Sequence, residues 1–337
     1  MGVRLQLPGT MNTPLTFRKY RIAAVIPAYR VQGGIVAVIR GLPAYVRHLI
    51  VVDDSSPDST SNRVAALAKL DRRIVLIRHA SNQGVGGAMV TGFRRALKLG
   101  AQIVVKVDGD GQMDVRHLPA LLTPLIEGRA DYVKGNRFRD FAALQKMPLI
   151  RRLGNMGLGF FAKAATGYWN LFDPTNGFLA IRTETLAQLP LDRIDHTYYF
   201  ETSVLAHLYL LGAVVCDIPM PARYQGEASS LIIHRALLEF PFKLLLTFLK
   251  RLALRNFLYD FTMETIYLLA GIPLLLFGLV FGGLKWIHYA ALNVPAPTGT
   301  VMLATLTVLL GIQFLLSAIE IDLRSVPREP LSPPLNA

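Results

Sequence analysis

The stretch IVVKVDGDGQ, residues 103–112, joins an apolar strand to an acidic turn and decides the expected fold. Four of its first five residues are valine or isoleucine, which favour strands, and its two glycines end the strand. Three similar runs precede it, at Ile22–Ile26, His48–Asp54 and Ile74–Ile77. Amphipathic stretches near 33–41, 59–71 and 85–99 separate the runs. Near-continuous apolar strands joined by helices predict an α/β domain with a mostly parallel sheet covered on both faces.

Polar residues stand where these strands are expected to end. Pro27 and Tyr29 follow the first run, and Asp54 closes the second. Asp108 and Asp110 close the fourth. Because ligands bind beyond the carboxyl ends of the strands in open α/β sheets, we expect these side chains to share one site.

The acidic turn itself is the strongest chemical signal in the chain. Asp108 and Asp110 are two residues apart beside flexible glycines, and Gln112 adds an amide oxygen. Three hard oxygen ligands at that spacing suit a divalent cation, which can bridge a diphosphate and stabilise it as it leaves. The alternative is a solvated acidic turn or an Asx turn without a metal. The Asp53-Asp54 pair stands at the corresponding end of the second strand, and this favours a metal site over a plain turn.

Two further segments are candidates for binding anions. Asn82–Ala88 begins a helix with three glycines, whose backbone N–H groups can meet an anion or can simply allow a tight turn. Gly135-Asn-Arg137 follows an apolar run, and its guanidinium either grips a phosphate or remains an exposed charge. Both readings stay open for both segments.

Composition places the chain outside the ordinary soluble class. Of 337 residues, 52% are hydrophobic and 18% charged, and the formal net charge is +13. The basic excess lies entirely before residue 256. A single cysteine, Cys216, excludes an internal disulfide framework and a zinc site built from several thiolates. We expect neither a signal peptide nor a myristoyl anchor in the first seventeen residues.

Two uncharged runs near the end of the chain predict a transmembrane hairpin. Thr265–Leu284 and Asn293–Ile319 are each long enough to cross a hydrocarbon core of about 30 Å. The alternative, two buried helices of a soluble core, needs more covering chain than remains. Basic residues are concentrated outside the short connection, so both termini and the domain before the hairpin should lie in the cytoplasm, at the inner membrane. Trp286 and Tyr289 suit the aromatic belt.

The segment before the hairpin predicts an amphipathic helix in the membrane interface. Residues 231–256 carry five basic residues and one acidic residue on about half of a helical wheel, a pattern that anionic lipids attract. The alternative is a helix packed on the soluble domain. Gly278 and Gly282 allow close helix approach, which suggests a homo-oligomer through the membrane helices. No nucleic-acid partner is expected, because the lipid surface accounts for the same charge.

Taken together, these motifs resemble the polyprenyl-phosphate glycosyltransferases, a membrane branch of the family 2 glycosyltransferases related to dolichol-phosphate mannose synthase. The matching pieces are Val25-Ile-Pro-Ala-Tyr29, Val51-Val-Asp-Asp54, Asp108-Gly-Asp-Gly-Gln112, Gly135-Asn-Arg137, Asp173–Phe178 and Phe200-Glu201. The resemblance covers roughly residues 20–230, and the hairpin is similar to the C-terminal pair of spans in bacterial members. It implies a GT-A (Rossmann-like) fold.

The resemblance also implies an activity and roles for individual residues. The activity is inverting transfer of one sugar from a UDP- or GDP-linked donor to a membrane polyprenyl phosphate. The nucleotide sugar would contact Pro27, Tyr29, Asp54 and Asp108, and Mg²⁺ or Mn²⁺ would be held by Asp108, Asp110 and Gln112. The acceptor phosphate would meet Arg137, Arg151, Arg152 and Arg223. Asp110, Arg137 and Asp173 are the expected catalytic residues, although a turn or N-cap before Pro174 explains Asp173 equally well.

Two departures from the family pattern concern the nucleotide side. The chain has Arg30-Val31 where the family often has Asn-Glu, and Ser55 stands where a glycine usually follows the aspartates. The identity of the nucleotide and of the sugar therefore stays open.

The expected organisation has five parts: a tail at 1–19, the glycosyltransferase domain at 20–230, a juxtamembrane helix region at 231–258, the hairpin at 259–323 and a cytoplasmic tail at 324–337. Two other functions compete. A processive polysaccharide synthase usually carries a Gln-x-x-Arg-Trp motif and more spans, whereas neither tryptophan here follows an arginine. A noncatalytic membrane partner that binds nucleotide or anionic polymer has no need of the acidic turn.

Overall fold

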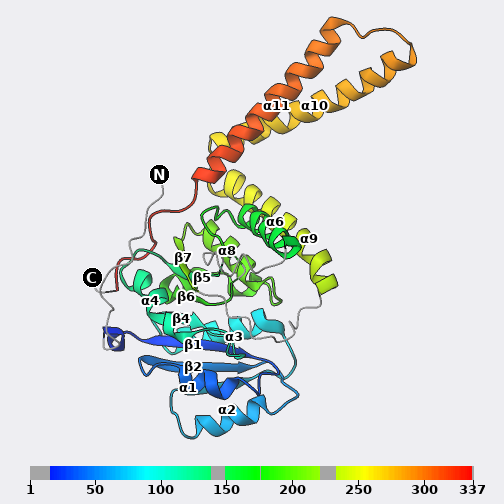
Figure 1. Ribbon diagram of the computed structural model, residues 1–337. Helices are drawn as coiled ribbons and strands as arrows, with labels where there is room; N and C mark the ends of the chain where they lie inside the picture. Colours follow the sequence, from blue (N-terminus) through cyan, green and yellow to red (C-terminus); the bar gives the residue numbers. More distant parts are fainter. Residues whose placement is uncertain (1–15, 138–148, 175, 221–232, 336–337) are drawn as a thin grey trace. The chain divides into compact units, whose positions relative to one another are not determined.

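The computed structural model describes residues 16–137, 149–174, 176–220 and 233–335. The chain forms two compact units. The first comprises Met1–Leu244 together with Pro327–Ala337, and the second comprises Leu245–Val326. The first unit contains a sheet covered by helices, and the second is dominated by two long helices (Figure 1).

The sheet of the first unit has seven strands in the order β3-β2-β1-β4-β6-β5-β7. Their bounds are β1 Ile22–Ala28, β2 Val46–Asp53, β3 Ile74–Arg78, β4 Ile103–Lys106, β5 Tyr132–Asn136, β6 Leu179–Arg182 and β7 Val215–Pro219. Among these strands only β6 runs antiparallel to its neighbours. The expected mostly parallel sheet is confirmed.

Helices cover both faces of this sheet. They are α1 Ile35–Gly41, α2 Thr60–Ala68, α3 Gly84–Lys98, α4 Leu118–Ile126, α6 Leu149–Thr166, α7 Thr183–Gln188 and α8 Phe200–Leu210. Short 3₁₀ turns occupy Thr16–Lys19, Val115–His117 and Leu191–Arg193. One face, including Ile22 and Ile26, shares a buried core with α1, α2 and α4. On the other face α3 lies so close to β1 that a Cβ on Gly92 would be 2.2 Å from Val25 Cγ1.

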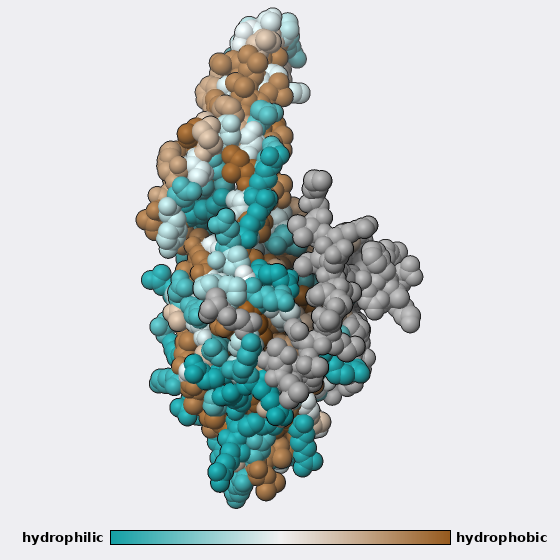
Figure 2. All heavy atoms as spheres, turned by 90° about the vertical axis from the view of Figure 1, so that its left-hand side faces the viewer, coloured by the Kyte–Doolittle hydropathy of each residue, from teal (hydrophilic) through white to brown (hydrophobic). Residues whose placement is uncertain are grey.

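The second unit is a helical hairpin preceded by the end of a long helix. α9 spans Ile233–Ala253 and continues into a π-helical segment, Leu254–Tyr259. α10 (Met263–Ala291) and α11 (Thr298–Arg324) are both long and apolar enough to cross a membrane. Apolar side chains cover much of these two helices on the face shown in Figure 2.

Small residues bring α10 and α11 together within the chain. A Cβ on Gly278 would lie 2.6 Å from Thr307 Oγ1, and one on Gly311 would lie 2.6 Å from the Leu275 backbone nitrogen. Gly282 also faces α11, near Ala304. The glycine pair that suggested self-association therefore packs inside the hairpin.

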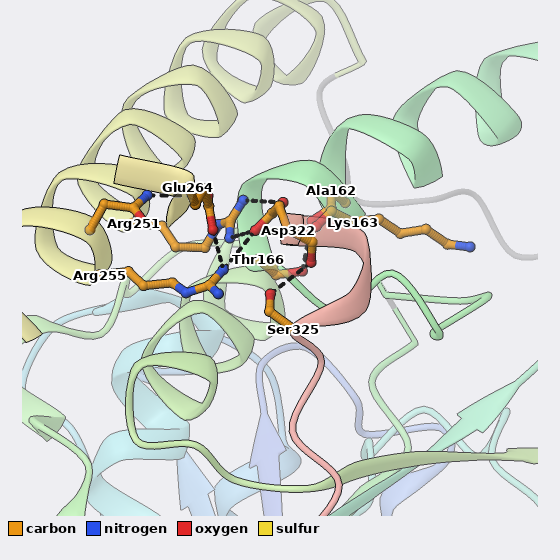
Figure 3. Close-up of polar contacts among 9 residues, drawn as sticks. Ala162, Lys163, Thr166, Arg251, Arg255, Glu264, Asp322 and Ser325 are labelled. Carbon is orange, nitrogen blue, oxygen red and sulfur yellow. Dashed lines mark hydrogen bonds and ion pairs between the residues drawn. The ribbon is translucent and has the colours of Figure 1, made fainter. Parts of the chain in front are cut away.

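A cluster of ion pairs joins the three helical pieces of this unit (Figure 3). The two terminal guanidinium nitrogens of Arg251 donate to the Asp322 carboxylate, at 2.6 and 3.0 Å. Arg255 lies 2.9 Å from Asp322 and 3.4 Å from Glu264. The sequence analysis placed Arg251 and Arg255 on a basic face that meets lipid head groups. The structure differs, because Arg251 is buried and both charges are balanced within the chain.

The end of the chain returns to the first unit after α11. The Leu331 N–H donates to the carboxylate of buried Asp131 at 3.0 Å. The guanidinium of buried Arg182 donates to the Pro333 carbonyl, and the Leu335 N–H donates to the Ile126 carbonyl at 3.0 Å. The first unit is thus built from chain segments on both sides of the hairpin.

Candidate active site

Three parallel strands end side by side and bring the predicted polar residues to one edge of the sheet. Ala28 in β1 pairs with Asp53 in β2, and Val25 pairs with Lys106 in β4. The Asp54 N–H donates to the Ala28 carbonyl at 2.9 Å. This register brings the strand ends together as expected, and a common ligand site at this edge stays a prediction.

The acidic turn leaves β4 directly after Lys106. Asp110 Oδ1 accepts the Gln112 N–H at 2.9 Å, which is the Asx turn foreseen as one reading, and Gly111 has a φ of 83°. A Cβ on Gly34 would lie 2.7 Å from the Asp110 carbonyl, so the start of α1 packs on the turn. The Asp108 side chain keeps 32% exposure, which leaves it open to a ligand.

The oxygen donors of this turn fit a hard divalent cation. No group of three or more His, Cys, Asp or Glu side chains with metal-binding geometry occurs within the described ranges. Asp108, Asp110 and the Gln112 amide would therefore supply only part of an oxygen shell, and a metal at this turn stays a prediction. An Asx turn at Asp110 is compatible with this, since each carboxylate has two oxygens.

Asp54 has a structural role that its sequence position did not reveal. Its side chain is buried, and its oxygens accept the N–H groups of Gln83 and Gly84, both at 2.8 Å. His79 Nδ1 lies 2.7 Å from Asp54 Oδ1, and His79 Nε2 lies 2.9 Å from Thr91 Oγ1. Asp54 thus anchors the glycine-rich turn to β2, and a direct nucleotide contact stays a prediction.

The glycine-rich start of α3 is closed by protein backbone. The Gly86 N–H donates to the His196 carbonyl at 2.9 Å, and a Cβ on Gly86 would be 2.2 Å from the Asp195 carbonyl. Close packing therefore accounts for the glycines. The Gly86 N–H, which an anion site would use, is already bonded to protein backbone.

Pro27, inside β1, and Tyr29 are the other residues predicted to contact the nucleotide. Tyr29 is 42% exposed, with the Arg30 guanidinium 5.2 Å from its ring centroid. Ser55, where the resembled family usually has glycine, has a φ of 60°. That conformation explains the family's glycine, and Ser55 adopts it here at some strain.

A buried lysine lies beneath the acidic turn, and the sequence analysis did not single it out. Lys106 Nζ is 2.8 Å from Asp108 Oδ1 and 3.1 Å from Glu201 Oε1. Burial by itself lowers the pKa of Lys106, but the two carboxylates outweigh it and raise the pKa above its ordinary value. The Lys106 side chain is therefore a permanent cation. The sequence feature that could have revealed Lys106 is a lysine in the middle of a valine-rich strand.

Arg137, which follows β5, is held by Asp173. The Arg137 guanidinium donates to both Asp173 oxygens, at 2.8 and 3.1 Å, and the backbone N–H of Arg137 donates to the same carboxylate. Asp173 is fully buried, while the Arg137 side chain is 37% exposed. Nearby, Lys134 Nζ donates to the Pro174 carbonyl at 2.6 Å. Asp173 therefore holds the guanidinium in one orientation, and part of the Arg137 side chain stays exposed.

The remaining acceptor candidates cannot be placed. Arg151 and Arg152 belong to α6, but their side chains lie outside the described residues, as does Arg223 entirely. The structure thus brings Asp108 near Lys106 and joins Arg137 to Asp173.

Comparison with known proteins places the chain in a family. The profile described as Glycosyl transferase family 2 matches residues 23–189. The UDP-N-acetylglucosamine–dolichyl-phosphate N-acetylglucosaminyltransferase of Methanococcus voltae is 32% identical over 181 residues, which are 50% of this chain and 72% of the relative. The chain belongs to glycosyltransferase family 2. It is therefore a glycosyltransferase, as the motifs indicated.

Other relatives and neighbours agree. The undecaprenyl-phosphate mannosyltransferase of Micrococcus luteus is 29% identical over 203 residues, covering 59% of this chain and 82% of that enzyme. The glucosyl-3-phosphoglycerate synthase of Mycobacterium tuberculosis, crystallised with Mn²⁺, UDP-glucose and phosphoglyceric acid, matches with a TM-score of 0.54 and 20% identity over 73% of this chain and 85% of that one. The latter shows the shared GT-A fold, and the predicted fold class is confirmed.

Proposed function

We propose that this glycosyltransferase moves one sugar from a UDP- or GDP-linked donor to a polyprenyl phosphate, with inversion at the anomeric carbon. The observation that carries the proposal is the pairing of two anion sites in one unit. An acidic turn at Asp108 suits a metal-bound diphosphate, and Arg137, oriented by Asp173, suits a second phosphate. The names of the Methanococcus and Micrococcus relatives, both lipid-phosphate transferases, support the same acceptor class.

The acceptor requires little activation. A phosphate monoester has a second pKa near about 6, so it is largely a dianion at neutral pH and needs no strong base. One of its oxygens attacks the anomeric carbon while the bond from that carbon to the donor diphosphate breaks. The nucleoside diphosphate leaves with the electron pair of that bond.

Positioning and charge neutralisation then supply the catalysis. Asp108, Asp110 and Gln112 would hold Mg²⁺ or Mn²⁺, which supplies positive charge for the leaving diphosphate. Arg137, oriented by Asp173, would bind the acceptor phosphate through the exposed part of its side chain. Asp173, fully engaged with Arg137, orients that guanidinium instead of removing a proton.

The membrane-length helices fit a lipid acceptor. Moving a long prenyl chain out of the bilayer costs about 0.8 kcal/mol of free energy per CH₂. The active site therefore has to work at the membrane surface. The hairpin at 259–323 would anchor the domain at 20–230 there. The return of the segment at 327–335 to the catalytic unit supports an even number of crossings, with both termini in the cytoplasm.

The direct test is transfer by the purified full chain in detergent. A short-chain polyprenyl phosphate is incubated with a panel of radiolabelled UDP- and GDP-sugars, and lipid-linked label is measured. We expect one donor to label the lipid, with the acceptor phosphate required, since the corresponding polyprenol lacks the anion that Arg137 binds. Transfer to the polyprenol or to water alone, with none to the phosphate, would contradict the proposal.

A further inference from the structure

A row of buried charges runs beneath the segment 173–178. Lys106 in β4 and Lys134 in β5 both stand opposite Leu179 in β6. Directly opposed residues of antiparallel strands project to the same face, so both ammonium groups enter the same layer. Both lysines are buried, and a buried charge is retained only where opposite charges or hydrogen bonds meet it.

Lys106 links the acidic turn to α8. Its ammonium contacts Asp108 Oδ1 at 2.8 Å on one side and Glu201 Oε1, from the first turn of α8, at 3.1 Å on the other. Asp108 sits where β4 gives way to a glycine, so its backbone does not by itself hold the carboxylate. Lys106 therefore fixes one oxygen of Asp108, whose side chain remains 32% exposed.

The same ammonium supports the segment that carries Asp173. A Cβ on Gly177 would lie 2.4 Å from Lys106 Nζ and 3.2 Å from Asp108 Oδ2. The Gly177 backbone therefore closes over the ion pair, and a side chain there would displace the Lys106 ammonium. Lys134 holds the same segment at the Pro174 carbonyl and makes no described contact with Asp108.

We propose that Lys106 is a positioning residue for the donor: it holds the Asp108 carboxylate in the orientation that binds the metal–diphosphate group, and Glu201 in turn holds Lys106. This inference rests on the proposed donor site. A purely structural lysine, present only to neutralise Glu201, would leave donor binding intact once both charges were removed together.

The experiment compares three variants of the full chain with the wild-type protein. Lys106→Met removes the ammonium at similar length, Lys106→Met/Glu201→Gln removes both charges, and Lys134→Met is the matched control for losing a buried lysine from the same face. Binding of UDP and of GDP in the presence of Mn²⁺ is measured by calorimetry. Thermal unfolding is followed in the same samples.

We expect Lys106→Met to unfold at a lower temperature and to lose about 10-fold or more in nucleotide affinity, because a charge-assisted contact to Asp108 is gone. The double variant should recover the unfolding temperature but not the affinity. Lys134→Met should keep nucleotide affinity within about twofold. In transfer assays, the donor KM of the double variant should rise while the acceptor KM changes little.

Recovery of nucleotide affinity in the double variant would overturn the inference, as would wild-type affinity in Lys106→Met. If the wild-type protein bound neither nucleotide, the donor site and this inference would fall together. If it bound nucleotide in the Lys106-dependent manner but transferred no sugar to polyprenyl phosphate, the proposed acceptor would be wrong and the role of Lys106 would stand.

Discussion

At the scale of single residues, replacing Asp110 should test whether sugar transfer depends on a bound metal. Asp110→Asn keeps a side-chain oxygen for the Asx turn but removes a negative charge from the proposed oxygen shell. We expect transfer to fall by about 100-fold or more and EDTA to abolish wild-type transfer until Mg²⁺ or Mn²⁺ is restored.

Asp114→Asn is the matched control for Asp110→Asn. Asp114 lies four residues away, and its largely buried carboxylate pairs with the exposed Arg116. Its loss should leave metal dependence unchanged. Undiminished transfer by Asp110→Asn in the presence of chelator would refute the metal site.

Arg137 is expected to act on the acceptor and not on the donor. Removing a guanidinium from a phosphate costs about 1.5–3 kcal/mol, so Arg137→Ala should raise the acceptor KM or lower kcat by roughly 10- to 150-fold. Nucleotide affinity by calorimetry should stay within about twofold. Arg129→Ala, which removes an exposed arginine paired with Glu127, is the control. Weakened donor binding with normal acceptor kinetics would move Arg137 to the nucleotide side.

Lys134 should make acceptor binding depend on pH. Burial lowers the pKa of its ammonium to about 8, although Asp173 and Glu201 oppose the effect. Above that pH the Asp173–Arg137 pair loses a neighbouring positive charge, so the KM for an anionic acceptor should rise by about 3- to 10-fold between pH 7 and 9. In Lys134→Met the KM should be raised already at pH 7 and vary little with pH. An equally steep rise in that variant would exclude Lys134 as the titrating group.

The same pKa has a consequence for stability. Between pH about 8 and about 10.4 the folded chain has released the Lys134 proton while the unfolded chain retains it. The unfolded state then binds more protons, so the contribution of Lys134 to the free energy of unfolding increases with pH over that window.

At the scale of elements, Gly86 at the start of α3 should not tolerate a larger residue. Gly86→Ala places a methyl group against the Asp195 carbonyl, and the backbone of this segment is bonded to α3 through the Gly86 N–H and the His196 carbonyl. Overpacking of this kind costs about 1–3 kcal/mol, and thermal unfolding should register it as a loss of several degrees. Gly154→Ala, in α6 with nothing within 4 Å among the residues that the structure describes, should leave stability equal or higher. Equal unfolding temperatures for the two variants would contradict the packing account.

The elements that sequence could predict are those with long apolar runs. β1 to β3 follow their valine and isoleucine runs to within a few residues, and β4 ends at Lys106, two residues before the expected end. β5, foreseen only as an apolar run before Gly135, extends to Asn136 and contains Lys134, and β6, which has four residues including Arg182, was not foreseen. Those charges are stabilised by partners far along the chain, such as Pro174 and Pro333, which periodicity cannot reveal.

The candidate site was predictable to the same extent. The strand ends placed Asp54 and Asp108 correctly at one edge of the sheet. Their partners, His79 for Asp54 and Lys106 for Asp108, depend on which side chains the folded strands bring into contact. Local sequence gives a residue's position on an element, whereas its hydrogen-bond partners are set by tertiary packing.

At the scale of the whole molecule, the hairpin was predicted from its lack of charge, yet its helices extend past the charges that bounded the prediction. α10 includes Glu264, and α11 includes Asp322. Arg255 contacts both carboxylates, so these helix ends keep charges that are balanced by a third element. Replacing one partner of such a buried pair is more costly than omitting the pair altogether.

The last prediction concerns the segment that returns from α11 to the catalytic unit. Asp131 is fully buried and accepts two backbone N–H groups, from Val214 at 2.8 Å and from Leu331 at 3.0 Å. Leu331→Pro removes the second donor, and a buried carboxylate that loses a hydrogen bond costs about 1–3 kcal/mol. We therefore expect the unfolding temperature of Leu331→Pro to fall, while Leu331→Ala, which keeps the N–H, stays near the wild-type value.

Deletion of residues 327–337 should reproduce the Leu331→Pro defect and enlarge it, because Arg182 then also loses the Pro333 carbonyl. The deletion variant should still sediment with membranes, since both membrane-length helices remain. A synthetic peptide of residues 326–337 added to it should restore part of the stability, because the contacts it makes need no covalent link. If Leu331→Pro and the deletion both unfolded like the wild type, the returning segment would contribute nothing to the catalytic unit. The support it gives for a cytoplasmic C-terminus would then be lost as well.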